Sequence, residues 1–252
     1  MTSNTSTATN KDSRFNAEAT NWDANPFVQA ATVHAHKALL SRLPPPEELA
    51  TYDVLEMGCG TGLLSLLLAP SARSLTAVDA AEGMINVLKS KLATSHAHLS
   101  NKVVPVHALL EDPDDDRIQF DPASSTGREK KRRFDLITSH LVLHHIPDPL
   151  SAVLTTMYGC LKPGTGRVML TDFENFGPEA RRFHAESKMA EVERDGIGRD
   201  EMRELMEAAG FVDVKIEVAF EMDKQVEREP GSGIKGGPIL RFPFLVCEGR
   251  RP

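Results

Sequence analysis

The sequence has few tryptophans, tyrosines and cysteines, and it has no long hydrophobic run. Its 252 residues include one tryptophan, two tyrosines and three cysteines. The cysteines are odd in number and far apart, so they indicate neither a disulfide framework nor a Cys-x-x-Cys metal pair. Because such usage is typical of reducing compartments, we expect an intracellular protein, in the cytoplasm and alternatively also in the nucleus.

Membrane signals and an excess of positive charge are also lacking. The longest apolar run, residues 63–70, is far shorter than the roughly 20 residues that span a bilayer. Residues 1–20 are polar and lack the apolar segment of a signal peptide. With 29 basic and 36 acidic side chains, the net charge is −7, which argues against general binding to nucleic acid or anionic membranes. The sequence does not exclude a protein partner.

What the sequence does contain is a globular composition, 40% hydrophobic and 26% charged, in a length that suits one α/β domain. From residue 51, short apolar strands alternate with helices, a pattern typical of a parallel sheet covered on both faces. Pro105 suits an edge strand. The expected strands are 51–57, 74–80, 102–110, 133–141 and 166–173, and the expected helices are 61–69, 81–93 and 148–161.

The C-terminal part departs from this alternation. After a helix at 199–211, two strands at 212–223 and 238–249 are joined by a glycine-rich connection with no room for a crossover helix. These strands must therefore be antiparallel neighbours. The sequence predicts an α/β fold with a Rossmann-like, doubly wound, seven-stranded and mostly parallel sheet that ends in an antiparallel β-hairpin.

Three segments lie outside the regular pattern. Residues 1–13 are polar and are expected to be a disordered tail. A helix is expected over 25–43, with Asn25 as its cap and Pro26 in its first turn. The insertion at 111–134 favours a solvated loop, and its basic block at 128–133 a solvated charged face, with nuclear import or partner contact as alternatives.

Three glycines, Gly58, Gly60 and Gly62, lie between the first strand and the next helix. The helix start has unpaired N–H groups, and glycines allow a ligand to approach them closely. Asp79, which ends the next strand, follows Gly58 by 21 residues, the spacing at which a carboxylate can accept both hydroxyls of a ribose. Leu63 stands where a dinucleotide fingerprint needs its third glycine. The pattern therefore predicts an adenosine-type ligand.

The stretch VLEMGCGTG, followed by LTAVDAAEGMI, FDLITSHLVLHHIPDP and LKPGTGRVMLTDF, resembles four motifs of the class I S-adenosylmethionine-dependent methyltransferases. The resemblance is greatest to the group that includes ubiquinone and menaquinone biosynthesis methyltransferases, among the type 11/12 methyltransferases. It implies S-adenosylmethionine as cofactor and methyl transfer to an O, N, S or C atom of a small molecule. Protein methylation, histones included, and a regulatory subunit without activity are the alternatives.

The resemblance also assigns roles to residues. A helical lid is implied at 14–50 and the cofactor-binding domain at 51–252, with a further substrate cover expected at 175–201. Leu109 stands where the family has a polar residue, so the adenine contact falls to the Leu110 backbone or to Glu111. The implied cofactor contacts are Glu56, Gly58, Cys59 and Gly60 for the methionine part, Gly62 for the turn, Asp79 for the ribose, Ala80, Met84, Leu110 and Glu111 for the adenine, and Ser139.

Residues for chemistry and substrate are expected around the fourth strand. His140 and His144 are candidate bases, and His140 is also a candidate substrate contact. Solvent exposure is the alternative for His144, and a structural hydrogen bond is expected for His145. Trp22 either contacts substrate or anchors the lid. Phe173 is a candidate substrate contact. The His140–His144 spacing lacks a third ligand at a telling distance, so no metal is expected.

Overall fold

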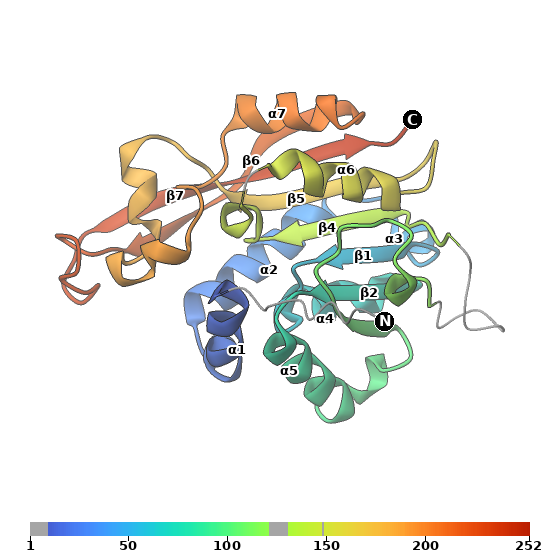
Figure 1. The fold of residues 1–252 in the computed structure, drawn as a ribbon, viewed down its shortest axis with the longest axis horizontal. Coiled ribbons are helices and arrows are strands. Elements are labelled where there is room, and N and C mark those ends of the chain that lie inside the picture. Colours follow the sequence, from blue (N-terminus) through green and yellow to red (C-terminus); the bar gives the residue numbers. More distant parts are fainter. Residues whose placement is uncertain (1–9, 121–130, 148) are drawn as a thin grey trace, which may run out of the picture.

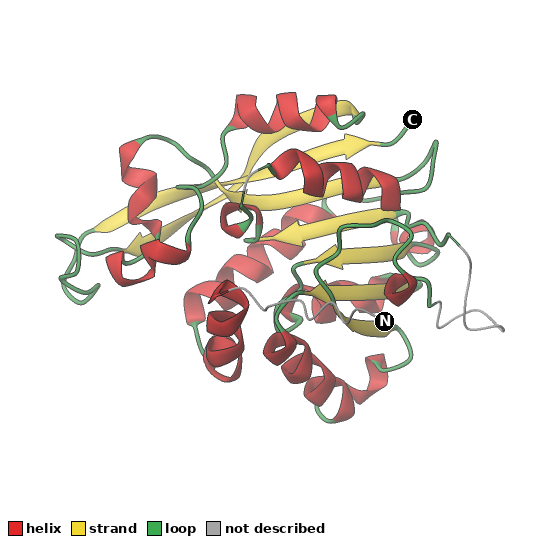
Figure 2. Ribbon diagram, in the orientation of Figure 1, coloured by secondary structure: helices red, strands yellow, loops and turns green. Residues whose placement is uncertain are grey.

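The structure is a computed structural model that describes residues 10–120, 131–147 and 149–252. The described residues form one seven-stranded sheet with helices on both faces (Figure 1, Figure 2). Its strands are β1 (Asp53–Met57), β2 (Ser74–Asp79), β3 (Val103–His107), β4 (Leu136–His140), β5 (Arg167–Phe173), β6 (Val212–Gln225) and β7 (Ile239–Arg250).

The α-helices are α1 (Asn10–Trp22), α2 (Pro26–Leu40), α3 (Pro46–Leu49), α4 (Leu63–Leu68), α5 (Glu82–Ala93), α6 (Leu150–Cys160) and α7 (Arg199–Ala208). Short 3₁₀ helices connect them: η1 (Ala69–Ser71), η2 (Ala97–Leu99), η3 (Asp116–Ile118), η4 (Leu143–His145), η5 (Pro178–Phe183) and η6 (Glu186–Glu191).

The strand order is β3-β2-β1-β4-β5-β7-β6. β1 to β5 are parallel, whereas β7 is antiparallel to both β5 and β6. The predicted fold class, including the C-terminal hairpin, is therefore confirmed. β3, which contains Pro105, is an edge strand as predicted, because its missing N–H costs least where no further strand pairs.

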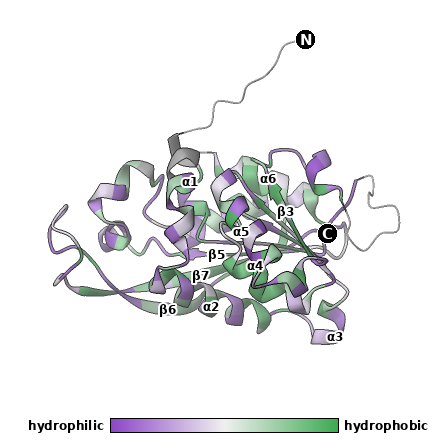
Figure 3. Ribbon diagram, turned by 90° about the horizontal axis from the view of Figure 1, so that it is seen from below, coloured by the Kyte–Doolittle hydropathy of each residue, from purple (hydrophilic) through white to green (hydrophobic). Residues whose placement is uncertain are grey.

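Two hydrophobic cores hold the helices on the sheet, because alternate strand residues face opposite sides. Leu55 and Ile137 pack toward α6 and α7, whereas their neighbours Val54 and Leu136 pack toward α4 and α5. Figure 3 shows hydrophobic residues concentrated on the strands and on the helix faces beside them. The sheet is thus buried on both faces, as the short apolar strands of the sequence predict.

The β6–β7 hairpin extends beyond the parallel part of the sheet (Figure 1). A third, aromatic core holds η5 against this extension. Phe183 of η5 stacks on Phe173 with centroids 3.9 Å apart, and it meets Phe242 edge-on at 5.2 Å. The long connection after β5 is therefore packed on the hairpin.

The N-terminal helices have separate places in the fold. α1 begins at Asn10, inside the tail predicted for 1–13, and residues 1–9 lie outside the described residues. α1 packs against α5, whereas α2 packs on α4 and β6. The Asn25 side chain accepts a hydrogen bond from the Phe27 N–H at 3.0 Å, so it caps α2 as predicted.

The prediction that residues 111–134 form a solvated loop is wrong at Arg132, whose side chain is buried with 2% exposure. Its guanidinium lies 3.3 Å from the Asp53 carboxylate and donates to the Ser74 hydroxyl at 2.7 Å. Arg73 also pairs with Asp53. Residues 121–130 of the loop lie outside the described residues. A charge run in the sequence did not reveal that one of its members is buried against the first residues of β1 and β2.

We expect Arg132→Met to lower the free energy of unfolding by about 2–4 kcal/mol, because it leaves buried Asp53 with fewer charge partners. Lys131→Met, which changes the exposed neighbour of the same charge, should stay within about 0.5 kcal/mol. Urea unfolding of both variants measures the difference. Equal effects at the two positions would contradict the buried ion pair.

Candidate active site

A cavity of about 570 Å³ lies at the carboxyl ends of β1, β2 and β4. Ligands in open α/β sheets bind at this edge, where the strand order reverses. Phe15 and Trp22 of α1 contribute to its wall, so this helix borders the cavity. The strand ends contribute Glu56, Met57, Val78, Asp79, Ser139 and His140.

The glycine turn forms the floor of the cavity. The N–H groups of Gly58 and Cys59 both donate to the Val78 carbonyl, at 2.8 and 3.0 Å, which holds the turn against β2. All three glycines have positive φ angles, +74° at Gly58, +54° at Gly60 and +82° at Gly62. A Cβ on Gly58 would overlap the side chain of Val142, whereas one on Gly60 would meet nothing within 4 Å. Open space therefore borders the turn at Gly60.

Asp79 joins the end of β2 to this turn. Its carboxylate accepts the Gly60 N–H at 2.7 Å and the Ala81 N–H at 2.8 Å. The residue also lines the cavity. The 21-residue spacing noted in the sequence thus corresponds to direct contact between the carboxylate and the glycine turn.

Glu56 is a buried acid at the end of β1, with 2% exposure, and it lines the cavity. The hydroxyl of Ser65 on α4 donates to its Oε2. Burial raises the pKa of Glu56 to about 8, and the nearby charge of Asp79 acts in the same direction, against the hydrogen bond from Ser65. The side chain is therefore mainly a neutral carboxylic acid at pH 7, poised to ionise when a cation approaches it.

The predicted adenine contacts divide into two groups. Ala80, Met84 and Leu110 line the cavity, and Met84 is buried beside Trp22. Leu109 also lines it, with 64% of its surface exposed. Glu111 does not belong to the lining, and its carbonyl accepts a hydrogen bond from the Thr156 hydroxyl at 3.0 Å.

Two buried polar atoms at the end of β4, in residues that line the cavity, lack a hydrogen-bond partner in the described part of the chain. Among the described residues, neither the Ser139 hydroxyl nor His140 Nε2 has a hydrogen-bond partner, although both atoms are buried. His140 Nδ1 lies 2.9 Å from the Thr171 hydroxyl. Burial lowers the pKa of His140 to about 4, so the imidazole is neutral at pH 7. Buried polar atoms of this kind indicate a ligand that supplies the missing partners.

His144 does not line the cavity, and because it is buried, the alternative of a solvent-exposed His144 is wrong. It is 1% exposed, and its Nδ1 lies 2.8 Å from a carboxylate oxygen of Asp172. Phe173 is also fully buried, and neither side chain lines the cavity. The cavity is instead lined by His145, for which the sequence indicated only a structural role.

The lid helix α1 is tied to the glycine turn and to α5. Asp23, just after α1, accepts a hydrogen bond from the Thr61 hydroxyl and pairs with Lys91. The Asn16 side chain accepts the Gly83 N–H. Trp22 lines the cavity and packs beside Met84, so the structure places it where either predicted role is available.

Residues 28–216 match a family model described as a methyltransferase domain, so the chain belongs to this family. The chain is similar to the ubiquinone biosynthesis O-methyltransferase of Pseudomonas fluorescens (strain Pf0-1), with 29% identity over 135 residues. The match covers 54% of this chain and 50% of that protein. The chain thus spans about half the length of the curated relatives it matches.

Solved structures share the fold. A SAM-dependent methyltransferase from Thermotoga maritima has a TM-score of 0.61 at 17% identity, covering 96% of this chain and 100% of that one. The N-methyltransferase NodS from Bradyrhizobium japonicum WM9, in complex with S-adenosyl-L-homocysteine, has a TM-score of 0.57 at 17% identity, with coverage of 97% and 100%. The family predicted from the four motifs is confirmed. No helix in the described part of the chain is long and apolar enough to cross a membrane.

The raised pKa of Glu56 predicts a pH dependence of stability. Folding favours the neutral form of Glu56. The contribution of this group to the free energy of unfolding is therefore fully present below the unfolded pKa of about 4.5 and is lost as pH rises through about 8. Between these values, Glu56→Gln should gain stability relative to the wild type by a few kcal/mol. Urea unfolding at pH 5 and pH 8 measures this. Parallel pH profiles for the two proteins would contradict the buried neutral acid.

Proposed function

We propose that this protein is an S-adenosylmethionine-dependent methyltransferase that acts on a small molecule. The observation that carries the proposal is one cavity that brings together a buried acid, the glycine turn and Asp79 at the strand ends of a methyltransferase-family fold. NodS, which has a similar fold, contains S-adenosyl-L-homocysteine in its structure.

The residues present fit this cofactor. The open side of Gly60 leaves room for a ligand, and the Ser139 hydroxyl lacks a partner among the described residues. Glu56 is a buried acid that can ionise toward an ammonium group. The cofactor would be held by Glu56, Gly58, Cys59, Gly60, Asp79, Ala80, Met84, Leu110 and Ser139. When bound, it supplies an electrophilic methyl group on a sulfonium.

The chain's own contribution is orientation and exclusion of water. α1 contributes Phe15 and Trp22 to the wall of the cavity, where they exclude water from one side of it. His140 presents a neutral Nε2 at the cavity, because its Nδ1 is directed to Thr171. A histidine whose pKa is lowered to about 4 is a weak base, so His140 serves mainly to accept a hydrogen bond from the methyl acceptor and align it.

The elements beside the cavity favour a small acceptor over a protein. α1 is joined to the connection after β5 by the Glu18–Lys188 ion pair at 3.0 Å. A protein side chain would need an open groove in their place.

The three cysteines are buried thiols, and burial raises the pKa of Cys160 to about 12. Free thiols support a reducing compartment, so we place the protein in the cytoplasm.

We expect Asp79→Asn to weaken S-adenosylhomocysteine binding by about 10- to 100-fold, since it removes a charged hydrogen-bond acceptor that also holds the turn. The control is Asp200→Asn, at an exposed position in the first turn of α7. Isothermal titration calorimetry measures both. Unchanged affinity in Asp79→Asn would contradict the assigned cofactor site.

Two substitutions distinguish the roles of the two ring nitrogens of His140. Asn can retain a donor toward Thr171 but lacks the second nitrogen, whereas Gln can place a polar group near Nε2. We expect the rate of methyl transfer to be at least about tenfold lower in His140→Asn than in His140→Gln, with cofactor affinity unchanged in both variants. Transfer from labelled cofactor into a metabolite extract is the assay, with a protein extract alongside. Label in protein alone would overturn the small-molecule acceptor, and label in neither would favour a regulatory subunit.

A further inference from the structure

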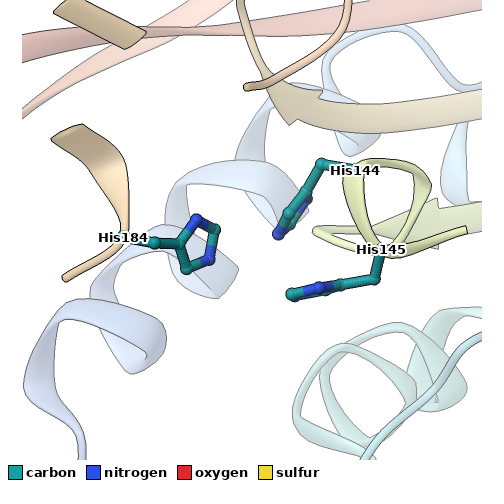
Figure 4. Close-up of side chains that lie close together, drawn as sticks. All are labelled: His144, His145 and His184. Atoms are coloured by element: carbon teal, nitrogen blue, oxygen red, sulfur yellow. The ribbon is translucent and has the colours of Figure 1, made fainter. Parts of the chain in front are cut away.

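Three histidines converge beside the cavity. His144 and His145 come from η4, and His184 follows η5, 39 residues later in the sequence. One ring nitrogen from each lies within 4.8 Å of the others. Figure 4 shows the three imidazoles around a common space. The centroids of His144 and His184 are 5.1 Å apart, and those of His145 and His184 are 5.5 Å apart.

His144 is oriented as a metal ligand. The Asp172 carboxylate accepts from its Nδ1 at 2.8 Å, which leaves the lone pair on Nε2. Asp172 is itself fixed by the N–H groups of His144 and Phe173, at 3.1 and 2.9 Å. Carboxylate, histidine and metal commonly stand in this order, because the carboxylate fixes the tautomer and the ring orientation.

The Nε2 atom of His144 needs a partner that the described residues do not supply. It is buried and has no hydrogen-bond partner among them. The aromatic rings of Phe173 and Phe183 lie at 4.9 and 6.3 Å from the His144 ring, so this side of the site is apolar. A buried acceptor in such surroundings indicates a bound ligand.

Three imidazole rings define the chemical class of that ligand. Imidazole suits zinc and its neighbours among the divalent transition metals. Tetrahedral zinc with bonds of about 2.0–2.1 Å holds its nitrogens about 3.3 Å apart, so side-chain rotations within the 4.8 Å cluster can form the site. Three histidines leave a fourth position open, as in catalytic zinc sites.

We propose that His144, His145 and His184 bind one divalent transition-metal ion of the zinc class, with Asp172 as the positioning residue of His144. Because His145 also lines the cavity in which we place the cofactor and the methyl acceptor, the metal site borders that cavity. An oxygen of the acceptor is a suitable fourth ligand. Only this last assignment rests on the proposed function; the metal site itself depends on the three histidines.

The test measures metal binding to the full chain without assaying activity. The purified protein is stripped with a chelator, dialysed against Zn²⁺, and analysed for bound metal. Co²⁺ is titrated in parallel, because tetrahedral Co²⁺ has characteristic visible absorption. We expect one ion per chain and a tetrahedral spectrum. A chain that binds no more Zn²⁺ than the His145→Ala/His184→Ala double variant would overturn the site.

Single variants assign the ligands. His145→Ala and His184→Ala should each weaken Zn²⁺ binding at least about 100-fold, and Asp172→Asn about 10- to 100-fold. His98→Ala removes an exposed histidine elsewhere and should leave binding unchanged. Loss of binding in His98→Ala equal to that in His184→Ala would overturn the assignment to these three ligands.

S-adenosylhomocysteine affinity is measured on every variant as a readout of folding and of the cofactor site. Retained affinity in His184→Ala, together with lost metal, supports the metal site directly. Metal binding without cofactor binding would refute the proposed function and leave the metal site standing. Cofactor binding without specific metal binding would overturn the metal site and leave the proposed function standing.

Discussion

Parallel pairing of β1 with β2 on one side and β4 on the other is the constraint on which the site depends. In this register Met57 lies opposite Val78, and Glu56 lies opposite both Ala77 and Thr138. All three carboxyl ends therefore reach one edge of the sheet. The glycine turn, Asp79 and His140 emerge there together, although they are far apart in the sequence. The Gly60–Asp79 hydrogen bond then closes this edge into the wall of a cavity.

The burial that stabilises the sheet also sets the chemistry at its edge. Burial raises the pKa of Glu56 and lowers the pKa of His140, so both groups favour their neutral forms near pH 7. A neutral acid and a neutral imidazole are compatible with an apolar core in a way that two isolated charges are not. Their polar atoms nevertheless face the cavity, where a charged or hydrogen-bonding ligand can engage them.

The connection between β5 and α7 links the lid, the hairpin and the histidine cluster. Phe183 packs into the aromatic core of the β6–β7 extension, and the next residue, His184, reaches the rings of His144 and His145. Lys188, further along, pairs with Glu18 of the lid. One segment therefore couples the position of α1 to the third histidine, and the long antiparallel hairpin is the platform that holds it.

The sequence by itself determined the sheet, its C-terminal hairpin, the family and the glycine turn with Asp79, because these depend on local periodicity and short-range spacing. It did not reveal buried Arg132 within a basic run, since its partner Asp53 belongs to a strand 79 residues earlier. Nor did it distinguish His144, which is buried on Asp172, from His145 at the cavity, because the packing of η4 against β5 decides which of the two neighbouring rings reaches Asp172. The meeting of both with His184 was decided only by tertiary structure, where packing of Phe183 on the hairpin brings a distant segment to the strand ends.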